Sequence, residues 1–374
     1  MKIRPFELER YFAKYEFSAH YLLSSSDCEP LRMAELLAMA DDETSSLWQD
    51  LKLGYTESPG HPLLRQEIAA LYKNFAPEDT LVMVPEEGIF LLMNALLEPG
   101  DHVVCTFPGY QSLYEIAHAI GCQVSLWKPD ESSGWAFDLD DLSRMMQPTT
   151  KLVVVNFPHN PTGHLPDRQA FNSIVSLAER SGVYLLSDEM YRFLEIDPAS
   201  RLPPACEYYE RAISLSGLSK AYGLPGLRLG WLATKTREVL ARVIALKDYT
   251  TICSSAPGEI LGVIGLRNKV KILEEQRARL LRNLTDLTEF IDAKPAQFQM
   301  VRPAGGSVCF PRLVEVEDTD AFCEELVREA GIMLLPSSLF QFGRQHVRIG
   351  FGREDFPQVL ERFAGYLDEQ QSRA

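Results

Sequence analysis

Short apolar segments of strand length alternate with segments of helix length through much of the chain, and this alternation restricts the possible folds more than any other feature. The strand-like segments are rich in valine, leucine and isoleucine, which is typical of strands buried on both faces. Repeated strand–helix units predict an α/β protein with a mostly parallel sheet covered by helices on both sides. Ligands of such sheets bind at the carboxyl ends of the strands. The predicted strands include residues 81–84, 124–127, 152–155, 183–187, 213–215 and 229–233, and the predicted helices include residues 113–120, 139–146, 166–180 and 238–247.

The length of 374 residues allows two domains, or one large domain with a smaller appendage. Residues 255–291 are predicted to be helical throughout and to connect the large domain to a smaller one. The helical spacing of four apolar side chains on one stripe favours this interpretation. These side chains are Leu280, Leu284, Leu287 and Ile291.

Charge and cysteine content exclude several classes of partner. The 37 basic and 52 acidic side chains give a formal net charge of −15, which disfavours binding to nucleic acid or to an anionic membrane. The seven cysteines show no CxxC spacing and no cluster with histidine, so we expect reduced thiols in the cytoplasm and no metal site. The sequence shows neither a signal-peptide pattern nor a run of 18 apolar residues, so we expect no membrane span.

The stretch Ser214–Trp231 carries the densest chemical signal. Lys220 lies among small and apolar residues, and loss of hydration there makes a neutral amine easier to form. A neutral amine can form an imine with an aldehyde, and the planar guanidinium of Arg228, eight positions on, suits a phosphate. An aldehyde and a phosphate on one molecule describe pyridoxal 5′-phosphate (PLP). The alternative is a solvated loop with two surface cations.

A second signal follows the predicted strand at residues 183–187. Asp188 lies where that strand ends, and a buried aspartate is costly unless it is paired. A protonated pyridine nitrogen would pair with it, and a pyridinium is the electron sink of PLP chemistry. The alternative is an aspartate that caps a helix or a loop.

Several motifs occur in an order that resembles the class I/II aminotransferases, which are fold-type-I PLP-dependent enzymes. They are Asn160-Pro-Thr-Gly163, Asp188-Glu-Met-Tyr191 and the Ser214–Trp231 stretch. The resemblance spans residues 45–370. It implies a large domain with a seven-stranded type of sheet and a smaller α/β domain built from both termini. We expect an N-terminal arm and part of the small domain at 1–40, the PLP-binding domain at 41–270 and the C-terminal small domain at 271–374.

The resemblance also implies roles for individual residues. Lys220 would hold the cofactor as a Schiff base, with Asp188 at the ring nitrogen and Tyr110 stacked on the ring. Asn160 and Tyr191 would bind the phenolic oxygen, and the Asn160–Pro161 bond would be cis. The phosphate would be bound by side chains and by backbone N–H groups at a helix start. The phosphate ligands would be Arg228, Ser216, Ser219 and the N–H groups of Glu86 and Glu87, with the side chain of Glu86 or Glu87 pointing away.

Substrate and subunit contacts follow from the same resemblance. Arg348 would make a bidentate contact with the substrate α-carboxylate. The alternative interpretation of Arg348 is a solvent-facing side chain. Arg344 and Arg353 are predicted to lie on the surface. Asn160 and Ser26 would line the substrate site, although residues 25–27 replace a glycine of the family. Tyr55 would reach the cofactor phosphate of a neighbouring subunit, which implies a homodimer.

The implied function is transfer of the α-amino group of an amino acid to a 2-oxo acid. Asp188 and Tyr191 would support the reaction while Lys220 moves the α-proton, first as base and then as acid. Departures from the family at residues 25–27 and 84–86 leave open a PLP-dependent β- or γ-lyase, or a cyclase. A cofactor-sensing regulator would need a DNA-binding domain, which neither the length nor the charge supplies.

Overall fold

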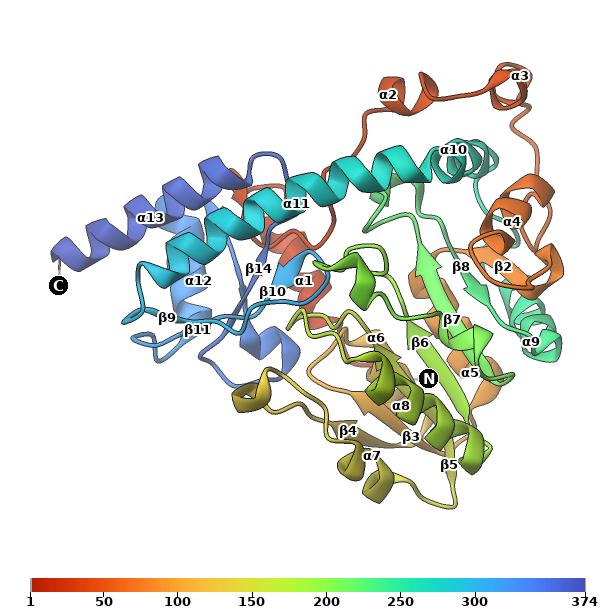
Figure 1. The fold of residues 1–374 in the computed structure, drawn as a ribbon, viewed down its shortest axis with the longest axis horizontal. Helices are drawn as coiled ribbons and strands as arrows, with labels where there is room; N and C mark the ends of the chain where they lie inside the picture. Colours follow the sequence, from red (N-terminus) through yellow and green to blue (C-terminus); the bar gives the residue numbers. More distant parts are fainter. Residues whose placement is uncertain (1, 374) are drawn as a thin grey trace.

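The computed structural model describes residues 2–373, and its main feature is one large sheet (Figure 1). Seven strands lie in the order β2-β8-β7-β6-β5-β3-β4. Strands β3 to β7 pair in parallel, whereas β8 is antiparallel to both β7 and β2. The predicted mostly parallel α/β sheet is therefore confirmed. Its strands are β2 (Thr80–Met83), β3 (His102–Thr106), β4 (Gln123–Trp127), β5 (Thr150–Asn156), β6 (Tyr184–Asp188), β7 (Ala212–Gly217) and β8 (Gly230–Ala233).

Helices cover both faces of this sheet because successive strand residues point to opposite sides and both sides are apolar. On β3, Val103 and Cys105 join the core with α5, α6 and α9, whereas Val104 joins the core with α7 and α8 on the other face. The helices are α5 (Pro85–Leu96), α6 (Ser112–Ile120), α7 (Leu139–Met145), α8 (Arg168–Ser181) and α9 (Arg237–Lys247).

Smaller sheets form a second region, seen to the left of the large sheet in Figure 1. Strand β1 (Tyr21–Leu22) pairs in parallel with β12 (Ile332–Met333), so the N-terminal segment packs with the C-terminal part of the chain. The three-part division predicted from the sequence stays a prediction. The remaining strands are β9 (Phe298–Gln299), β10 (Val308–Cys309), β11 (Arg312–Leu313), β13 (Leu335–Pro336) and β14 (Val347–Gly350), and the helices are α12 (Thr319–Ala330) and α13 (Phe356–Arg373).

The predicted continuous helix over 255–291 is wrong in one respect, because the structure has two helices there. α10 (Ala256–Arg267) ends at Asn268, and α11 (Lys269–Asp292) begins directly after it. The Asn268 side chain donates to the carbonyls of Met39 and Ile264, and such local bonds compete with helix continuation. Helix α11 then runs from beside α10 to the region of α12 and α13 (Figure 1).

The N-terminal part contains four helices that precede the large sheet. They are α1 (Glu7–Tyr15), α2 (Met33–Leu37), α3 (Asp42–Gln49) and α4 (Pro62–Ala69). Across residues 2–373, every helix falls short of the length and apolar character that crossing a membrane requires.

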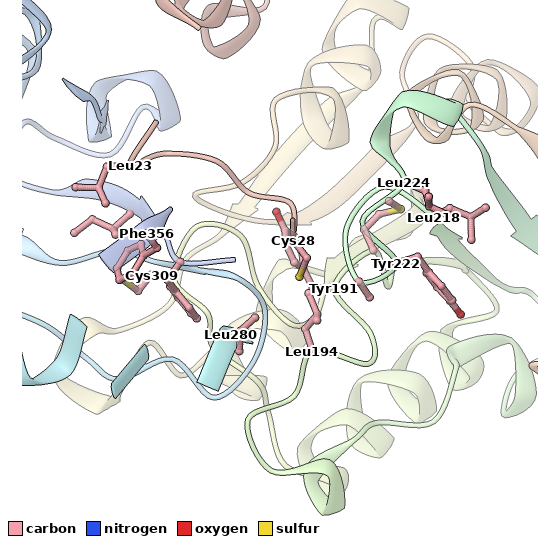
Figure 2. Packing of buried hydrophobic residues seen from close by; sticks show 14 of the residues in the cluster. Leu23, Cys28, Tyr191, Leu194, Leu218, Tyr222, Leu224, Leu280, Cys309 and Phe356 are labelled. Carbon is pink, nitrogen blue, oxygen red and sulfur yellow. The ribbon is translucent and has the colours of Figure 1, made fainter. Parts of the chain in front are cut away.

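One apolar core joins the small-sheet region to the segment after β7. In Figure 2, Phe356 and Leu280 lie at one end of this core and Leu218 and Tyr222 at the other, with Cys28 between them. Cys28 is fully buried and its neighbours belong to distant parts of the sequence. The N-terminal segment that contains Cys28 is therefore held against both regions.

Candidate active site

A cavity with a volume of about 370 Å³ lies at the carboxyl ends of the parallel strands. Asn156 ends β5 and Asp188 ends β6, and both line the cavity. The loop from β7 to β8 carries Lys220 and Arg228 to the same place. This location is the one expected for a ligand of a parallel sheet.

Most of the site residues predicted from the sequence lie on the wall of this cavity. They are Ser26, Glu86, Tyr110, Asn160, Asp188, Tyr191, Ser219, Lys220, Arg228 and Arg348.

Three predicted residues lie elsewhere. Ser216 pairs with Trp231 inside the sheet, because it sits within β7 rather than in the loop beyond it. The Glu87 side chain turns away, as predicted for one of the two glutamates, and accepts hydrogen bonds from the hydroxyls of Thr250 and Thr251. Tyr55 is 90% exposed and lies outside the cavity of its own chain.

The Lys220 amine donates a hydrogen bond of 2.7 Å to the Ser26 hydroxyl. Its nitrogen also lies 5.8 Å from the ring centre of Tyr191. Ser26 belongs to the segment that replaces a family glycine, and this segment crosses β14, where the Gly350 amide donates to the Leu23 carbonyl. The N-terminal segment therefore places a hydroxyl beside the amine.

Asp188 is a buried carboxylate, 6% exposed, that faces the cavity. One of its oxygens accepts the Met190 amide hydrogen at 3.1 Å. Burial raises the pKa of Asp188 to about 7, with the Met190 bond and the Lys220 charge acting in the opposite direction. A cation in the cavity would therefore restore the ionised form.

Arg348 is 1% exposed, so the alternative of a solvent-facing arginine is wrong. Its guanidinium donates to two neutral oxygens, Asn160 Oδ1 at 3.2 Å and the Ser24 carbonyl at 2.9 Å. Its Nε has no hydrogen-bond partner among residues 2–373. Burial lowers the pKa of Arg348, and an anion bound in the cavity would offset that cost.

Asn160 is held by a residue that sequence reasoning missed. The backbone N–H of Asn160 donates to Asn156 Oδ1 at 2.8 Å, and Asn156 Nδ2 donates to the backbone carbonyl of Asp188 at 3.1 Å. The Asn160–Pro161 bond is cis, as predicted. The signal for Asn156 was its position at the end of a buried strand.

The part of the cavity lined by the β7–β8 loop and the start of α5 has polar groups that suit an anion. The Ser219 hydroxyl is buried without a partner among the described residues, and Arg228 donates only weakly, at 3.4 Å, to the Pro225 carbonyl. Glu86 does not turn away as Glu87 does, because it accepts from the Ser112 hydroxyl at 3.1 Å. Burial raises the pKa of Glu86 to about 7, which reduces its repulsion of an anion near neutral pH.

Helix α1 and Glu16, which directly follows it, supply lining residues that sequence reasoning also missed. Glu9, Phe12 and Glu16 face the cavity, and their spacing of three and four residues places them on one helical face. The Tyr110 hydroxyl donates to Glu9 at 3.0 Å, and the Phe6 ring lies 4.9 Å from the Tyr110 ring. The spacing of these three residues could have indicated that they share one helical face, but it did not indicate that this face lies over the cavity.

The prediction that Arg353 lies on the surface is wrong. Its guanidinium contacts both carboxylate oxygens of Asp27, at 3.0 and 3.1 Å. Its side chain is 25% exposed, and Asp27 lines the cavity. The ion pair forms because Gly352 lies against the backbone of Asp27, which brings the following arginine close.

Comparison with known proteins agrees with this geometry. The family of class I and II aminotransferases matches residues 31–363, so the chain belongs to that family. Capreomycidine synthase of Streptomyces vinaceus is 30% identical over 348 residues, which are 92% of this chain and 88% of the relative.

Two solved structures share the fold over nearly the whole chain. A PLP-dependent aminotransferase from Streptococcus suis is 32% identical with a TM-score of 0.92, covering 99% of both chains. The PLP-dependent cyclase OrfR is 27% identical with a TM-score of 0.89, covering 99% of this chain and 98% of its own. The protein is therefore a fold-type-I, PLP-dependent enzyme.

The cavity residues fit PLP. Asp188 is a buried carboxylate with one N–H partner and room for a pyridinium. The hydroxyls of Ser219 and Tyr191 are buried without partners among residues 2–373, and they would suit the phosphate and the phenolic oxygen. Arg228 would neutralise the phosphate, and Lys220 would carry the aldehyde carbon.

Proposed function

We propose that the protein transfers the α-amino group of an amino acid to a 2-oxo acid, with Lys220 as the residue that carries PLP. The observation that supports this most is that Lys220, Asp188 and Arg348 line one cavity. They are an amine for the aldehyde, a carboxylate for the ring nitrogen and a guanidinium for the substrate carboxylate.

The bound cofactor supplies an electron sink for the substrate α-carbon. Arg348 orients the substrate by its α-carboxylate, and Asn160 Oδ1 fixes the guanidinium. Asp188 would pair with the ring nitrogen and favour its protonated form. The free Lys220 amine would take the proton from the substrate α-carbon as a base and release it again as an acid.

The enzyme is proposed to work as a homodimer. Tyr55 is 90% exposed, Leu53 is 86% exposed and Tyr249 is 89% exposed, so these side chains are available for contact with a second chain. In this proposal Tyr55 reaches the phosphate of the neighbouring site. Co-expression of Lys220→Ala with Tyr55→Phe chains tests it, because hybrid dimers would regain one intact site, whereas each variant alone would have none.

Cyclisation or elimination is the second candidate. It is favoured by the similarity to capreomycidine synthase and to the cyclase OrfR. Such reactions would use the same Lys220 proton transfer but would need no 2-oxo acid acceptor.

Acceptor dependence separates the two candidates. The purified holoenzyme is incubated with a panel of amino acids, with and without 2-oxo acids, and products are identified by mass spectrometry. Parallel double-reciprocal plots and a product amino acid made only with an acceptor support transfer. A cyclic or deaminated product formed without an acceptor contradicts it.

A further inference from the structure

Among the described residues, more carboxylates than cationic side chains line the cavity. Three cationic side chains and five carboxylates line it, namely Lys220, Arg228 and Arg348 against Glu9, Glu16, Asp27, Glu86 and Asp188. Under the proposed function each cation has a ligand, because Lys220 carries the cofactor, Arg228 meets the phosphate and Arg348 meets the substrate carboxylate. Asp188 serves the ring nitrogen, and Glu86 lies toward the phosphate. Three carboxylates then have no assigned ligand.

These three carboxylates lie on two neighbouring segments. Glu9 lies on α1 and Glu16 directly follows the last residue of that helix, whereas Asp27 follows Ser26, the hydrogen-bond partner of Lys220. Within residues 2–373, the Glu9 side chain accepts a hydrogen bond only from the Tyr110 hydroxyl, which is neutral. No hydrogen bond or ion pair joins the Glu16 side chain to another residue in 2–373, whereas Asp27 is paired with Arg353.

The three carboxylates are close enough to influence one another. Partial burial raises the pKa of Glu16 first, and repulsion by Asp27 and Glu9 raises it further, while Arg353 and Lys220 act in the opposite direction. Like charges collected at one wall destabilise an empty site, and a bound cation would relieve that repulsion.

Arg348 provides an independent indication of the ligand. It is 1% exposed, lines the cavity, and its Nε is without a partner among the described residues. The guanidinium donates its hydrogen bonds to neutral oxygens, so these bonds leave its positive charge without an anionic partner. A ligand that satisfies both walls has a carboxylate at one end and a positive charge at the other.

We infer that the amino-acid substrate has a positively charged side chain, a guanidinium or an ammonium group, which Glu9, Glu16 and Asp27 receive. This inference rests on the proposed function, because Arg348 fixes the α-carboxylate and Lys220 the α-carbon, and the side chain extends toward α1. Phe12 lies between the two glutamates on the same helical face, where its ring can cover the alkyl stem of a long cationic side chain.

The test is a titration of the holoenzyme, following the visible absorbance of the bound cofactor. L-Arginine is compared with L-citrulline, its neutral isostere, and L-lysine with L-norleucine. We expect the cationic member of at least one pair to bind roughly ten- to a hundredfold more tightly, as charge-assisted hydrogen bonds of this kind contribute. Equal affinity within both pairs, or tighter binding of the neutral members, would overturn the inference.

Variants on α1 locate the effect. Glu9→Gln and Glu16→Gln should reduce the preference for the cationic member, whereas Glu7→Gln on the same helix should leave it unchanged, because Glu7 is exposed and lies outside the cavity. An unchanged preference in both cavity variants would refute the assignment.

The titration needs no 2-oxo acid, so its result is separate from the proposed transfer reaction. Selective binding of cationic amino acids without transfer to any acceptor would support the inference and contradict the proposed function. Transfer of the amino group from neutral amino acids alone would support the proposed function and contradict the inferred cationic substrate.

Discussion

Lys220 Nζ and Ser26 Oγ lie 2.7 Å apart although 194 positions separate them in the sequence. The lysine follows strand β7 of the large sheet, whereas the serine belongs to the N-terminal segment that packs with β12 and β14. The Lys220 amine is therefore held between two regions of the chain. The site depends on how these regions pack as well as on the loop that carries the lysine.

Ser26→Ala should lower kcat more than it raises KM, because the hydroxyl contacts the amine and not the part of the cavity that binds carboxylate. The loss of one hydrogen bond to a charged group predicts a roughly tenfold effect. Steady-state kinetics with a saturating 2-oxo acid measure it. Ser143→Ala, an exposed serine on α7, is the control, and equal kinetics for the two variants would contradict the role of Ser26.

Arg348→Lys should raise KM for the amino acid by roughly ten- to a hundredfold, because a lysine keeps the charge but loses the planar fork. Arg344→Lys makes the same exchange at a side chain that is 62% exposed and paired with Asp318. KM in that control should not change. An Arg348→Lys enzyme with normal KM would show that the carboxylate binds elsewhere.

The cofactor-free protein should lose stability as pH rises from about 4 toward 7. The pKa of Asp188 is about 7 in the folded protein, above its ordinary value of 3.8, so the folded state binds the proton more tightly over this interval. Stability from that proton is present at low pH and is lost as pH rises through about 7. The contribution is on the order of a few kcal/mol.

Asp188→Asn should flatten that pH dependence in urea denaturation of the cofactor-free protein. Part of the slope should remain, because burial also raises the pKa of Glu86 to about 7 and of Glu259 to about 6. Asp286→Asn, an exposed site on α11, is the control. A slope unchanged by Asp188→Asn would show that this carboxylate is ionised in the cofactor-free fold.

Gly350→Ala should destabilise the protein by roughly 1–3 kcal/mol and weaken cofactor binding. A Cβ at this position would lie 1.7 Å from the Ser25 carbonyl oxygen, so the segment with Ser26 would have to move. Gly365→Ala, where a Cβ meets nothing within 4 Å, is the control on α13. Equal denaturation midpoints for the two variants would show that the segment adjusts freely.

Much of the fold could be predicted from the sequence because buried parallel strands have a simple pattern. Apolar runs such as residues 152–155 predict buried strands such as β5, and their alternation with helices predicts a mostly parallel sheet. The break at Asn268 was missed because an asparagine within a helical pattern becomes a stop only through its bonds to Met39 and Ile264.

The site was predictable where a motif follows a strand, as at Asp188 and Lys220, because strand ends converge at one edge of the sheet. Contacts made by the N-terminal segment were not predictable in this way. The positions of Glu9 and Glu16 over the cavity depend on the packing of α1 against distant residues such as Tyr110, which no local pattern records.

Peptide mapping identifies the lysine that carries the cofactor. The holoenzyme is reduced with borohydride, which makes the lysine–cofactor bond permanent, then digested and analysed by mass spectrometry. We expect a pyridoxyl group on the peptide that contains Lys220, and no pyridoxyl group on the corresponding peptide of a Lys220→Ala variant. Labelling of a different lysine in the native enzyme would contradict it.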